Sequence, residues 1–267
     1  MYQTTYHRAS SVAEAASLFA KGKEAKYLAG GQTLLPVMKQ RLASPSDVID
    51  LTKIDDLVGC SGGGTLSGVR IGAATTHYEV SKDPSILKAI PAIADLASQI
   101  GDPAVRYRGT IGGSLANNDP AADYPAAVLA LNAVIKTNKR TIAADDFFKG
   151  LFTTALEDGE IITAVDFPLV EKAGYAKFPH PASRFALTGV FVARKGGEVR
   201  VAATGASQNG VMRVPAIEAA LKANWSPGAI DSVNISADGL LNDIHGSSDY
   251  RANLIKVMAQ RAVQAAG

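Results

Sequence analysis

Apolar residues near the start of the chain follow a helical period. They share one face of a predicted helix over residues 11–20, where Ser11 and Glu14 have the spacing of a capping box and Gly22 is a suitable stop. The next segments alternate as strand, helix and strand, over residues 26–29, 34–42 and 47–51. The pattern predicts a compact β-α-β opening, with the glycines 30 and 31 in the turn between the first strand and its helix.

The middle of the chain mixes short strand and helix patterns. Sparse apolar residues over 59–75 indicate a hairpin with its turn at Ser61–Gly64. The helical pattern over 86–100 restarts after Pro91, because proline suits a first turn but not a helix interior. An apolar helix and a strand follow, over residues 121–131 and 134–137.

Proline and glycine gather over residues 168–182, and we place a domain boundary there. Beyond it the pattern predicts two strands and two helices, over residues 189–194, 199–204, 214–223 and 250–266. The chain as a whole therefore has the mixed pattern of an α+β fold.

Composition and charge remove several classes of function. The 267 residues include 27 Lys and Arg against 25 Asp and Glu, a net charge of +2, so no positive excess is available for nucleic acid. Cys60 is the single cysteine of the sequence, so the chain's own thiols cannot build a disulfide, a thiolate zinc site or an iron–sulfur cluster. The longest apolar stretch, residues 124–135, falls well short of the roughly 20 residues that span a bilayer. We expect a cytoplasmic protein with no transmembrane segment, which can still dock at the inner face of the membrane through partner chains.

Several catalytic motifs are missing from the sequence. It contains no G-x-x-x-x-G-K-S/T phosphate loop, no H-E-x-x-H metal motif and no G-x-S-x-G nucleophile elbow. The four histidines are scattered without ligand spacing, and we interpret His180 as structural and His77 as a surface or hydrogen-bonded histidine. The sequence therefore predicts no catalytic residue and no metal ligand of its own.

Two glycine pairs carry the clearest chemical signal. Gly30–Gly31 and Gly112–Gly113 each follow an apolar segment and lie near a predicted helix start. Consecutive residues without a Cβ let a ligand approach the main chain and meet a row of backbone N–H groups. Those amides, with the hydroxyls of Thr33, Thr110 and Ser114, would suit a pyrophosphate. The two pairs together indicate a dinucleotide cradle.

The residues around these glycines resemble a known family. The segments that carry the resemblance are residues 29–36, 100–106, 108–116 and 119–123. They are similar to the medium, FAD-binding subunit of the molybdenum hydroxylases, the family of xanthine dehydrogenase and aerobic carbon monoxide dehydrogenase. The resemblance extends over essentially the whole chain.

The resemblance implies a vanillyl-alcohol-oxidase-type FAD-binding fold of two subdomains, followed by a smaller C-terminal α+β domain. The FAD-binding domain would span residues 1–167 with an inner boundary near residue 55, and the C-terminal domain residues 168–267. The pyrophosphate cradle would consist of Leu28, Ala29, Gly30, Gly31, Gln32, Thr33 and Leu34 together with Thr110, Ile111, Gly112, Gly113 and Ser114. Asp123 matches an acid that hydrogen-bonds FAD, Ile100 would lie near the isoalloxazine, Ile162 would line the pocket, and Lys177 matches a lysine beside the flavin.

The residues themselves leave other roles open. Asp123 can equally cap the helix that follows it or pair with that helix's dipole. Lys177 can be a solvated charge on a strand, although a cation near the flavin would also raise its reduction potential. Arg106 and Arg108 flank Tyr107, and they can serve a subunit contact or an internal ion pair.

The implied function is electron transfer. FAD on this chain would accept electrons from the [2Fe-2S] clusters of a small partner subunit and pass them to a terminal acceptor, while a large subunit holds the molybdenum cofactor. The expected assembly is a dimer of heterotrimers. The sequence leaves the substrate and the acceptor open. It also leaves two alternatives, a standalone FAD-dependent reductase such as a UDP-N-acetylenolpyruvoylglucosamine reductase, and a non-catalytic assembly or scaffold protein.

Overall fold

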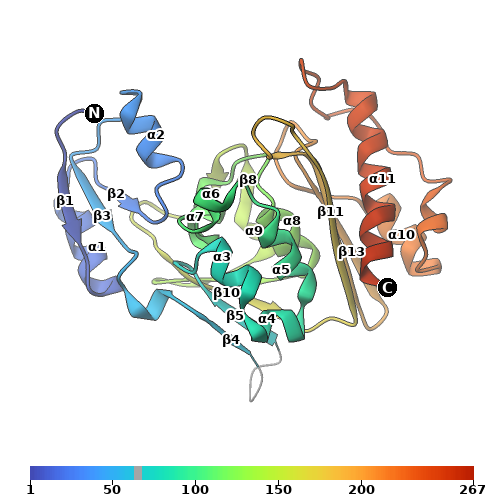
Figure 1. Ribbon diagram of the computed structural model, residues 1–267, viewed down its shortest axis with the longest axis horizontal. Coiled ribbons are helices and arrows are strands. Elements are labelled where there is room, and N and C mark those ends of the chain that lie inside the picture. Colours follow the sequence, from blue (N-terminus) through green and yellow to red (C-terminus); the bar gives the residue numbers. More distant parts are fainter. Residues whose placement is uncertain (63–67) are drawn as a thin grey trace.

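The structure is a computed structural model, and it describes residues 1–62 and 68–267. Figure 1 shows three pieces that follow one another in chain order, each built on its own sheet. We name them the N-terminal piece (residues 1–58), the central piece (59–62 and 68–168) and the C-terminal piece (169–267). Helices and strands are mixed in each, so the predicted α+β class is confirmed.

The N-terminal piece is a parallel sheet with the strand order β1-β3-β2, and its bounds are β1 (Thr5–Arg8), β2 (Lys26–Leu28) and β3 (Asp47–Asp50). Its helices are α1 (Val12–Lys21), α2 (Leu34–Lys39) and the 3-10 turn η1 (Asp55–Leu57). The predicted β-α-β opening is confirmed, and α1 begins after Ser11, whose side chain accepts a hydrogen bond from the Glu14 amide. Strand β1 was not predicted, because its residues are mostly polar and exposed.

The central piece holds an antiparallel sheet with the order β4-β5-β10-β6-β7. Its strands are β4 (Cys60–Gly62), β5 (Gly68–Gly72), β6 (Val134–Thr137), β7 (Thr141–Ala143) and β10 (Ile162–Pro168), and β8 (Phe148–Gly150) pairs separately with β9 (Thr153–Thr154). Strands β4 and β5 form the predicted hairpin, although its predicted turn at Ser61–Gly64 lies partly outside the described residues.

Seven short helices surround this sheet: α3 (His77–Lys82), α4 (Pro84–Ala89), α5 (Pro91–Ser98), α6 (Pro103–Arg106), α7 (Ile111–Asn117), α8 (Tyr124–Ala130) and α9 (Ala144–Phe147). The pattern over 86–100 is thus two helices, divided at Ile90, since the residue before a proline avoids helical backbone angles.

The C-terminal piece is an antiparallel sheet of β11 (Lys172–Pro179), β12 (Ala186–Lys195), β13 (Glu198–Thr204) and β14 (Met212–Arg213), followed by α10 (Pro215–Ala223), η2 (Pro227–Ile230) and α11 (Ser248–Ala266). Helix α11 covers one face of this sheet, as Figure 1 shows, and α8 of the central piece packs against the other. Strand side chains alternate accordingly: Val190 and Val192 share a core with α11, whereas Phe191 and Ala193 share one with α8.

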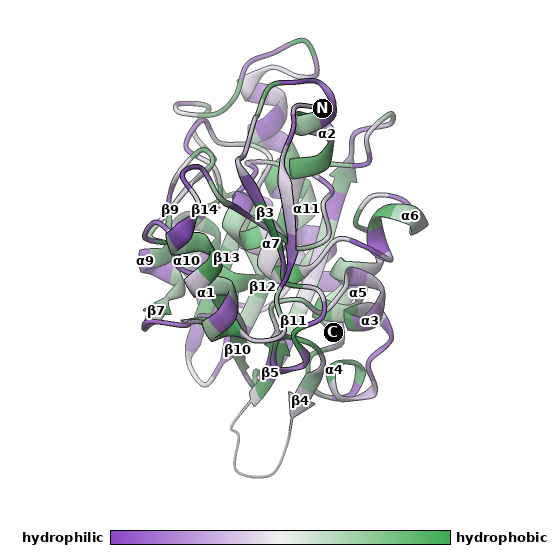
Figure 2. Cartoon of the chain, turned by 90° about the vertical axis from the view of Figure 1, so that its left-hand side faces the viewer, coloured by the Kyte–Doolittle hydropathy of each residue, from purple (hydrophilic) through white to green (hydrophobic). Residues whose placement is uncertain are grey.

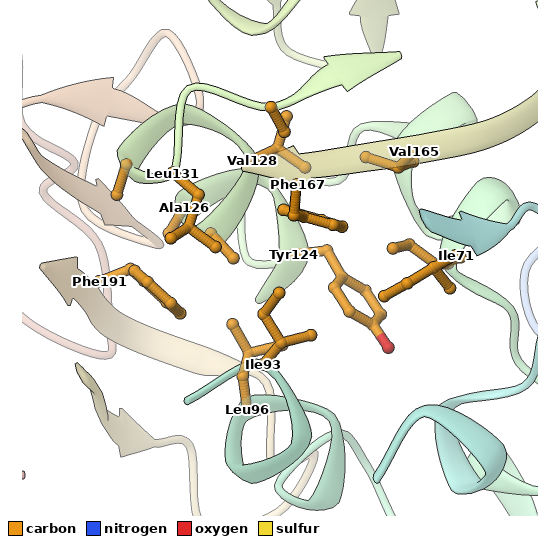
Figure 3. Packing of buried hydrophobic residues seen from close by; sticks show 14 of the residues in the cluster. Ile71, Ile93, Leu96, Tyr124, Ala126, Val128, Leu131, Val165, Phe167 and Phe191 are labelled. Atoms are coloured by element: carbon orange, nitrogen blue, oxygen red, sulfur yellow. The ribbon is translucent and has the colours of Figure 1, made fainter. Parts of the chain in front are cut away.

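The largest core therefore runs from the central sheet into the C-terminal piece. Figure 3 shows Phe167, Tyr124, Ile93 and Phe191 packed together in it, and all four are almost fully buried. In Figure 2 hydrophobic residues concentrate on inner strands such as β10. Among the described residues, no helix combines the length and the apolar character needed to cross a membrane.

Candidate cofactor site

A cavity of about 660 Å³ lies where the three pieces meet. Residues 26–34 line it from the N-terminal piece, residues of the 100–123 and 156–162 segments from the central piece, and residues 183–185 from the C-terminal piece. All the residues predicted to hold a cofactor line this cavity except Ile111 and Lys177. Its size is that of a pocket for a cofactor or a drug-sized ligand.

The first glycine bend, residues 30–33, presents unused backbone donors to this cavity. The amides of Gly30, Gly31, Gln32 and Thr33 make no hydrogen bond to any residue that the structure describes. The Thr33 side chain does not cap α2, so its hydroxyl is also free for a ligand. Gly31 has a φ of +72°, a backbone conformation that glycine adopts without strain.

The two glycine segments touch each other through Gly30. A Cβ on Gly30 would lie 2.1 Å from the carbonyl oxygen of Arg108 and 2.6 Å from the Cα of Gly109. Only a residue without a side chain can therefore stand there. This contact holds the first glycine bend against the segment that leads into α7.

The second glycine pair was also expected to leave its backbone amides free for a ligand, and this prediction was wrong. Gly112 and Gly113 lie in the first turn of α7, which Thr110 caps by accepting a hydrogen bond from the Gly113 amide at 3.1 Å. The amide of Ile111 donates to Thr75 and that of Gly112 to Ala73, at 3.3 and 2.9 Å. These amides are already used inside the protein, so they are not available as the predicted row of donors.

Helix α7 contributes to the cavity in two ways: it leaves space at Gly113, and it places the Ser114 hydroxyl at the wall. A Cβ on Gly113 would meet the Thr110 hydroxyl at 3.0 Å and Ala29 at 3.5 Å, so this glycine lets the two segments approach closely. Ser114, one residue further on, also lines the cavity. Ile111 points into the core and is fully buried.

A buried charge pair lies at the cavity wall, where Asp123 lines the cavity and Lys177 lies behind Asp123. Asp123 is 4% exposed, and its Oδ1 accepts hydrogen bonds from Tyr175 at 2.5 Å and from Lys177 at 2.9 Å. Lys177 also donates to the backbone carbonyl of Gln99 at 2.8 Å. Burial raises the pKa of Asp123, and the Lys177 charge opposes that effect.

This geometry decides between the roles that the sequence left open. Asp123 precedes α8 but makes no capping hydrogen bond, so the capping interpretation is wrong. The Lys177 side chain is 3% exposed, so it is not a solvated charge either. Lys177 does not line the cavity itself, and its contact with the cavity wall is the ion pair with Asp123. Tyr175 donates to the same carboxylate, and sequence reasoning missed this residue because it lies in no motif.

His77 is neither at the surface nor fully hydrogen-bonded, so the interpretation from the sequence was wrong. It lines the cavity, it is 4% exposed, and its Nδ1 has no hydrogen-bond partner within the described part of the chain. Burial, with a smaller contribution from the Arg106 charge, lowers its pKa to about 4. The imidazole is therefore neutral near pH 7.

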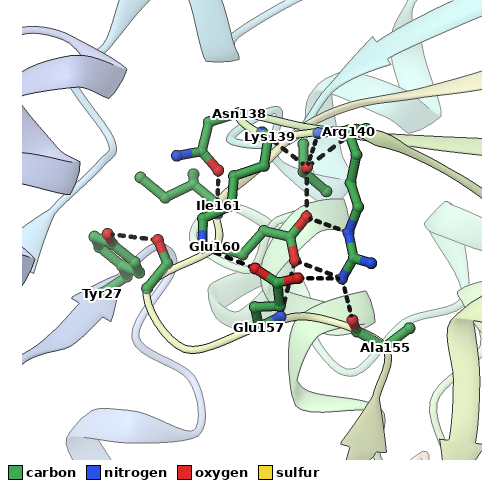
Figure 4. A network of polar contacts seen from close by, with 10 residues as sticks. Tyr27, Asn138, Lys139, Arg140, Ala155, Glu157, Glu160 and Ile161 are labelled. Carbon is green, nitrogen blue, oxygen red and sulfur yellow. Dashed lines mark hydrogen bonds and ion pairs between the residues drawn. The ribbon is translucent and has the colours of Figure 1, made fainter.

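A polar network fixes the opposite wall, as Figure 4 shows. Glu160 accepts hydrogen bonds from Arg140 at 3.0 and 3.1 Å, from Thr137 at 2.7 Å and from the Glu157 amide at 2.8 Å. These contacts, the Arg140 hydrogen bonds first, lower the pKa of Glu160 to about 2. The network holds residues 160–162, which include the predicted pocket residue Ile162, against the cavity.

Comparison with known proteins identifies the family. The family described as FAD binding domain in molybdopterin dehydrogenase matches residues 2–170. The chain belongs to this family. It is 35% identical to the nicotine 6-hydroxylase medium subunit of Paenarthrobacter nicotinovorans and 35% identical to the carbon monoxide dehydrogenase medium chain of Afipia carboxidovorans, covering 98% of this chain and 96% of each relative.

Solved structures of the family have the same fold. A crystal structure of Cu,Mo-CO dehydrogenase superposes with a TM-score of 0.86 at 32% identity, covering 100% of this chain and 98% of the other. Quinoline 2-oxidoreductase from Pseudomonas putida 86 superposes with a TM-score of 0.86 at 28% identity, covering 99% and 96%. The predicted FAD-binding fold and family are confirmed.

The cavity fits the family's FAD. The free amides of the first glycine bend suit a diphosphate, which needs many donors and little side-chain bulk. Two acids at the wall, Asp123 and Glu160, are each already bound to a cation, which limits their repulsion of an anion. Ile100 and Ile162 supply an apolar surface for a flat ring system.

Proposed function

We propose that this chain is the FAD-carrying electron-transfer subunit of a heteromeric molybdenum hydroxylase. The observation that carries the proposal is the first glycine bend, four backbone amides without a protein acceptor, at the wall of a large cavity in a chain of this family. FAD, when bound, accepts and releases electrons either singly or in pairs, the chemistry that links one-electron clusters to a terminal acceptor.

In this proposal the residues of the chain bind FAD and orient it. Residues 28–34, 110 and 112–114 would hold the diphosphate, with the amides of the first glycine bend and the hydroxyls of Thr33 and Ser114 as donors. Ile100 and Ile162 form apolar walls. Asp123 holds the Lys177 ammonium in a fixed place behind the cavity, and the neutral His77 adds no charge there.

The partner chains follow from what this chain lacks. Each [2Fe-2S] cluster of the usual type needs four cysteine thiolates, and this sequence has one cysteine. We therefore infer a small subunit with two [2Fe-2S] clusters and a large subunit with the molybdenum cofactor, assembled as a dimer of heterotrimers. Relatives named medium subunit or medium chain support this arrangement.

The domain boundaries and the location stay proposals. The FAD-binding domain would span residues 1–167, divided near residue 55, and the C-terminal domain residues 168–267. The end of the family match at residue 170 and the separate sheets of the three pieces support this division. We also propose that the complex works in the cytoplasm, where it can dock at the inner face of the membrane through its partners.

Purification tests the proposal. The protein should be yellow with bound FAD, should hold no iron or molybdenum by itself, and should co-purify with a large and a small partner chain. A colourless protein without affinity for FAD would support the scaffold alternative. A yellow protein that oxidises a substrate without partners would support the standalone reductase.

A further inference from the structure

The two ring nitrogens of His77 lie in different surroundings. His77 lines the cavity although the residue is almost fully buried. Its Nδ1 is fully enclosed and has no hydrogen-bond partner among the described residues. Its Nε2 makes no hydrogen bond with those residues either, but it is not one of the enclosed atoms. The Nε2 is therefore the polar atom of this ring that a ligand in the cavity can reach.

Gly109 places this nitrogen beside the first glycine bend. A Cβ on Gly109 would lie 2.6 Å from the His77 Nε2, and a Cβ on Gly30 would lie 2.6 Å from the Gly109 Cα. Gly109 therefore lies between the imidazole and the bend, in contact with both. The His77 amide also donates to the Gly109 carbonyl at 2.9 Å, which fixes His77 to this segment. The Nε2 thus borders the bend whose four amides make no hydrogen bond to any described residue.

The surroundings of His77 also decide which nitrogen carries the proton. A neutral imidazole has one N–H donor and one acceptor nitrogen, and burial keeps His77 neutral near pH 7. A buried N–H without an acceptor is rare in proteins, so a proton on the enclosed Nδ1 is disfavoured. On Nε2 the same proton is available to a ligand in the cavity. We therefore assign the tautomer with the proton on Nε2.

The two arginines close to this wall are directed elsewhere. Arg106 donates to the backbone carbonyls of Ile100 and Gly101, both at 3.0 Å. Neither Arg106 nor Arg108 has a carboxylate within ion-pair distance among the residues described, so the internal ion pair that the sequence allowed is wrong. Neither arginine lines the cavity. A ligand at this wall therefore meets the neutral imidazole and not a cation.

We propose that the His77 Nε2–H donates a hydrogen bond to the diphosphate of FAD. The inference rests on the proposed function, because it requires FAD with its diphosphate at the first glycine bend. His77 adds one side-chain donor to the backbone amides of residues 30–33. A hydrogen bond to a charged oxygen is stronger than one between neutral groups, and a neutral donor costs less to bury than a cation. His77 therefore holds the cofactor in place and takes no part in electron transfer.

Three substitutions at His77 distinguish the donor from the shape of the side chain. His77→Leu keeps a branched side chain of similar size and removes both nitrogens. His77→Gln places an amide N–H close to the position of Nε2, whereas His77→Asn, one methylene shorter, places it close to the position of Nδ1. Only the glutamine variant keeps a donor where the inference requires one.

Tyr124 provides a matched control. Its ring packs against that of His77 with 5.4 Å between centroids, and its hydroxyl is also enclosed without a partner among the described residues. Tyr124 belongs to the central core, as Figure 3 shows, and does not line the cavity. Tyr124→Phe therefore reports the effect of losing a buried polar group beside His77 without losing a donor to the cavity.

The test measures the affinity of the full-length chain, freed of its cofactor, for FAD, ADP and riboflavin by calorimetry. ADP carries the diphosphate without the flavin, and riboflavin carries the flavin without the diphosphate. His77→Leu and His77→Asn should bind FAD and ADP about tenfold more weakly and riboflavin as the wild type does. His77→Gln and Tyr124→Phe should stay within about threefold of the wild type for all three ligands. Thermal unfolding of the same samples should show that every variant is folded.

Nitrogen NMR of the labelled histidine side chains gives a second measurement, which a merely structural role of His77 would not affect. The spectrum should show the His77 proton on Nε2. Exchange of that proton with solvent should slow when FAD or ADP binds, because a hydrogen-bonded proton is protected.

The contrary results are distinct. The inference is overturned if His77→Leu binds FAD as tightly as the wild type, if its loss of affinity appears with riboflavin instead of ADP, or if the proton lies on Nδ1. Equal losses in His77→Leu and Tyr124→Phe would also overturn it, since packing and not the donor would then matter. A wild-type chain that binds neither FAD nor ADP would refute the proposed function itself. A wild-type chain that binds FAD, with unaffected His77 variants, would refute only the contact at His77.

Discussion

The first glycine bend and the second glycine pair look alike in sequence and do different work. At residues 30–33 the chain leaves a strand, adopts a positive φ at Gly31, and presents four amides without a protein acceptor. At Gly112–Gly113 the chain is already helical, and the amides of residues 111–113 donate to Thr75, Ala73 and Thr110. A glycine pair thus signals close approach of main chain, but it does not say whether a ligand or the protein takes the donors.

The difference assigns distinct duties to the two segments. The first glycine bend supplies hydrogen-bond donors, whereas the second glycine pair supplies room and rigidity beside them. The two depend on each other, since Gly30 packs directly on the backbone of Arg108 and Gly109. Substitutions at different positions can therefore distinguish three effects: loss of the folded structure, loss of hydrogen-bond donors to FAD, and loss of space for FAD.

The largest effect is expected at Gly30. In Gly30→Ala the new Cβ would lie 2.1 Å from a backbone carbonyl oxygen, and no rotation can relieve a clash between main-chain groups. We expect a loss of about 3 kcal/mol or more in unfolding free energy, a fall in melting temperature on the order of 10 °C, and loss of FAD. Thermal unfolding measures this, and a variant as stable as the wild type would show that the two segments do not pack as described.

Low pH should reduce the free energy of unfolding through His77, whose backbone is hydrogen-bonded to Gly109 in the segment that leads to the second glycine pair. The pKa of His77 is lowered to about 4 in the folded protein, so the unfolded chain takes up a proton between pH 6.5 and 4 while the folded chain does not. Stability should fall as pH drops through this window, by on the order of 3 kcal/mol, and then level off for this group. Chemical denaturation across the window should show a flatter profile for His77→Leu than for the wild-type chain, and an equally steep profile would contradict the prediction.

Substitutions at Gly31 and Gly113 distinguish the loss of hydrogen-bond donors from the loss of space for FAD. Gly31→Ala forces a side chain into the left-handed region at a cost of about 1–2 kcal/mol, which displaces the amides and should weaken FAD binding about tenfold. Gly113→Ala favours the helix by up to about 1 kcal/mol, so its melting temperature should not fall, while FAD binding weakens by a few fold because the new methyl group narrows the approach. Titration with FAD, beside thermal unfolding, distinguishes the two. Equal losses in both variants would contradict the assigned duties.

The smallest effect is expected at Thr110. Thr110→Val removes the cap of α7 and should cost about 1 kcal/mol of stability. The substitution also releases the Gly113 amide, which then becomes available as a donor to FAD. FAD affinity should therefore fall less than in Gly31→Ala. Denaturant unfolding and FAD titration on the same sample check both statements, and a loss of affinity as large as at Gly31 would make the second segment an equal partner in binding.

Local pattern sufficed for much of the fold. The β-α-β opening, the strands β12 and β13 and the helix α11 follow from short-range periodicity and from stops such as Gly22. Strand β1 did not, because its polar residues become a strand only by pairing with β3, about 40 residues away. The break at Ile90 was visible in advance because proline acts on its own neighbours.

The site was predictable as segments and not as contacts. The motifs located the cavity-lining stretches 28–34 and 110–114 but not residues 183–185. The fate of the second set of amides depended on carbonyl acceptors at residues 73 and 75, far upstream. The same holds for Tyr175, which reaches Asp123 from strand β11, and for His180 and His245, whose ring nitrogens lie 3.2 Å apart although 65 positions separate them in the chain. Such pairings arise from tertiary packing, which no local pattern contains.

Hydrogen exchange of the backbone amides, with and without FAD, tests most directly which segment provides the donors. Amides that are already hydrogen-bonded exchange slowly, and free amides gain protection when a ligand accepts from them. We predict that FAD strongly protects the amides of Gly30–Thr33 and leaves those of Ile111–Gly113 unchanged. Protection of residues 111–113 without any change at residues 30–33 would contradict the account.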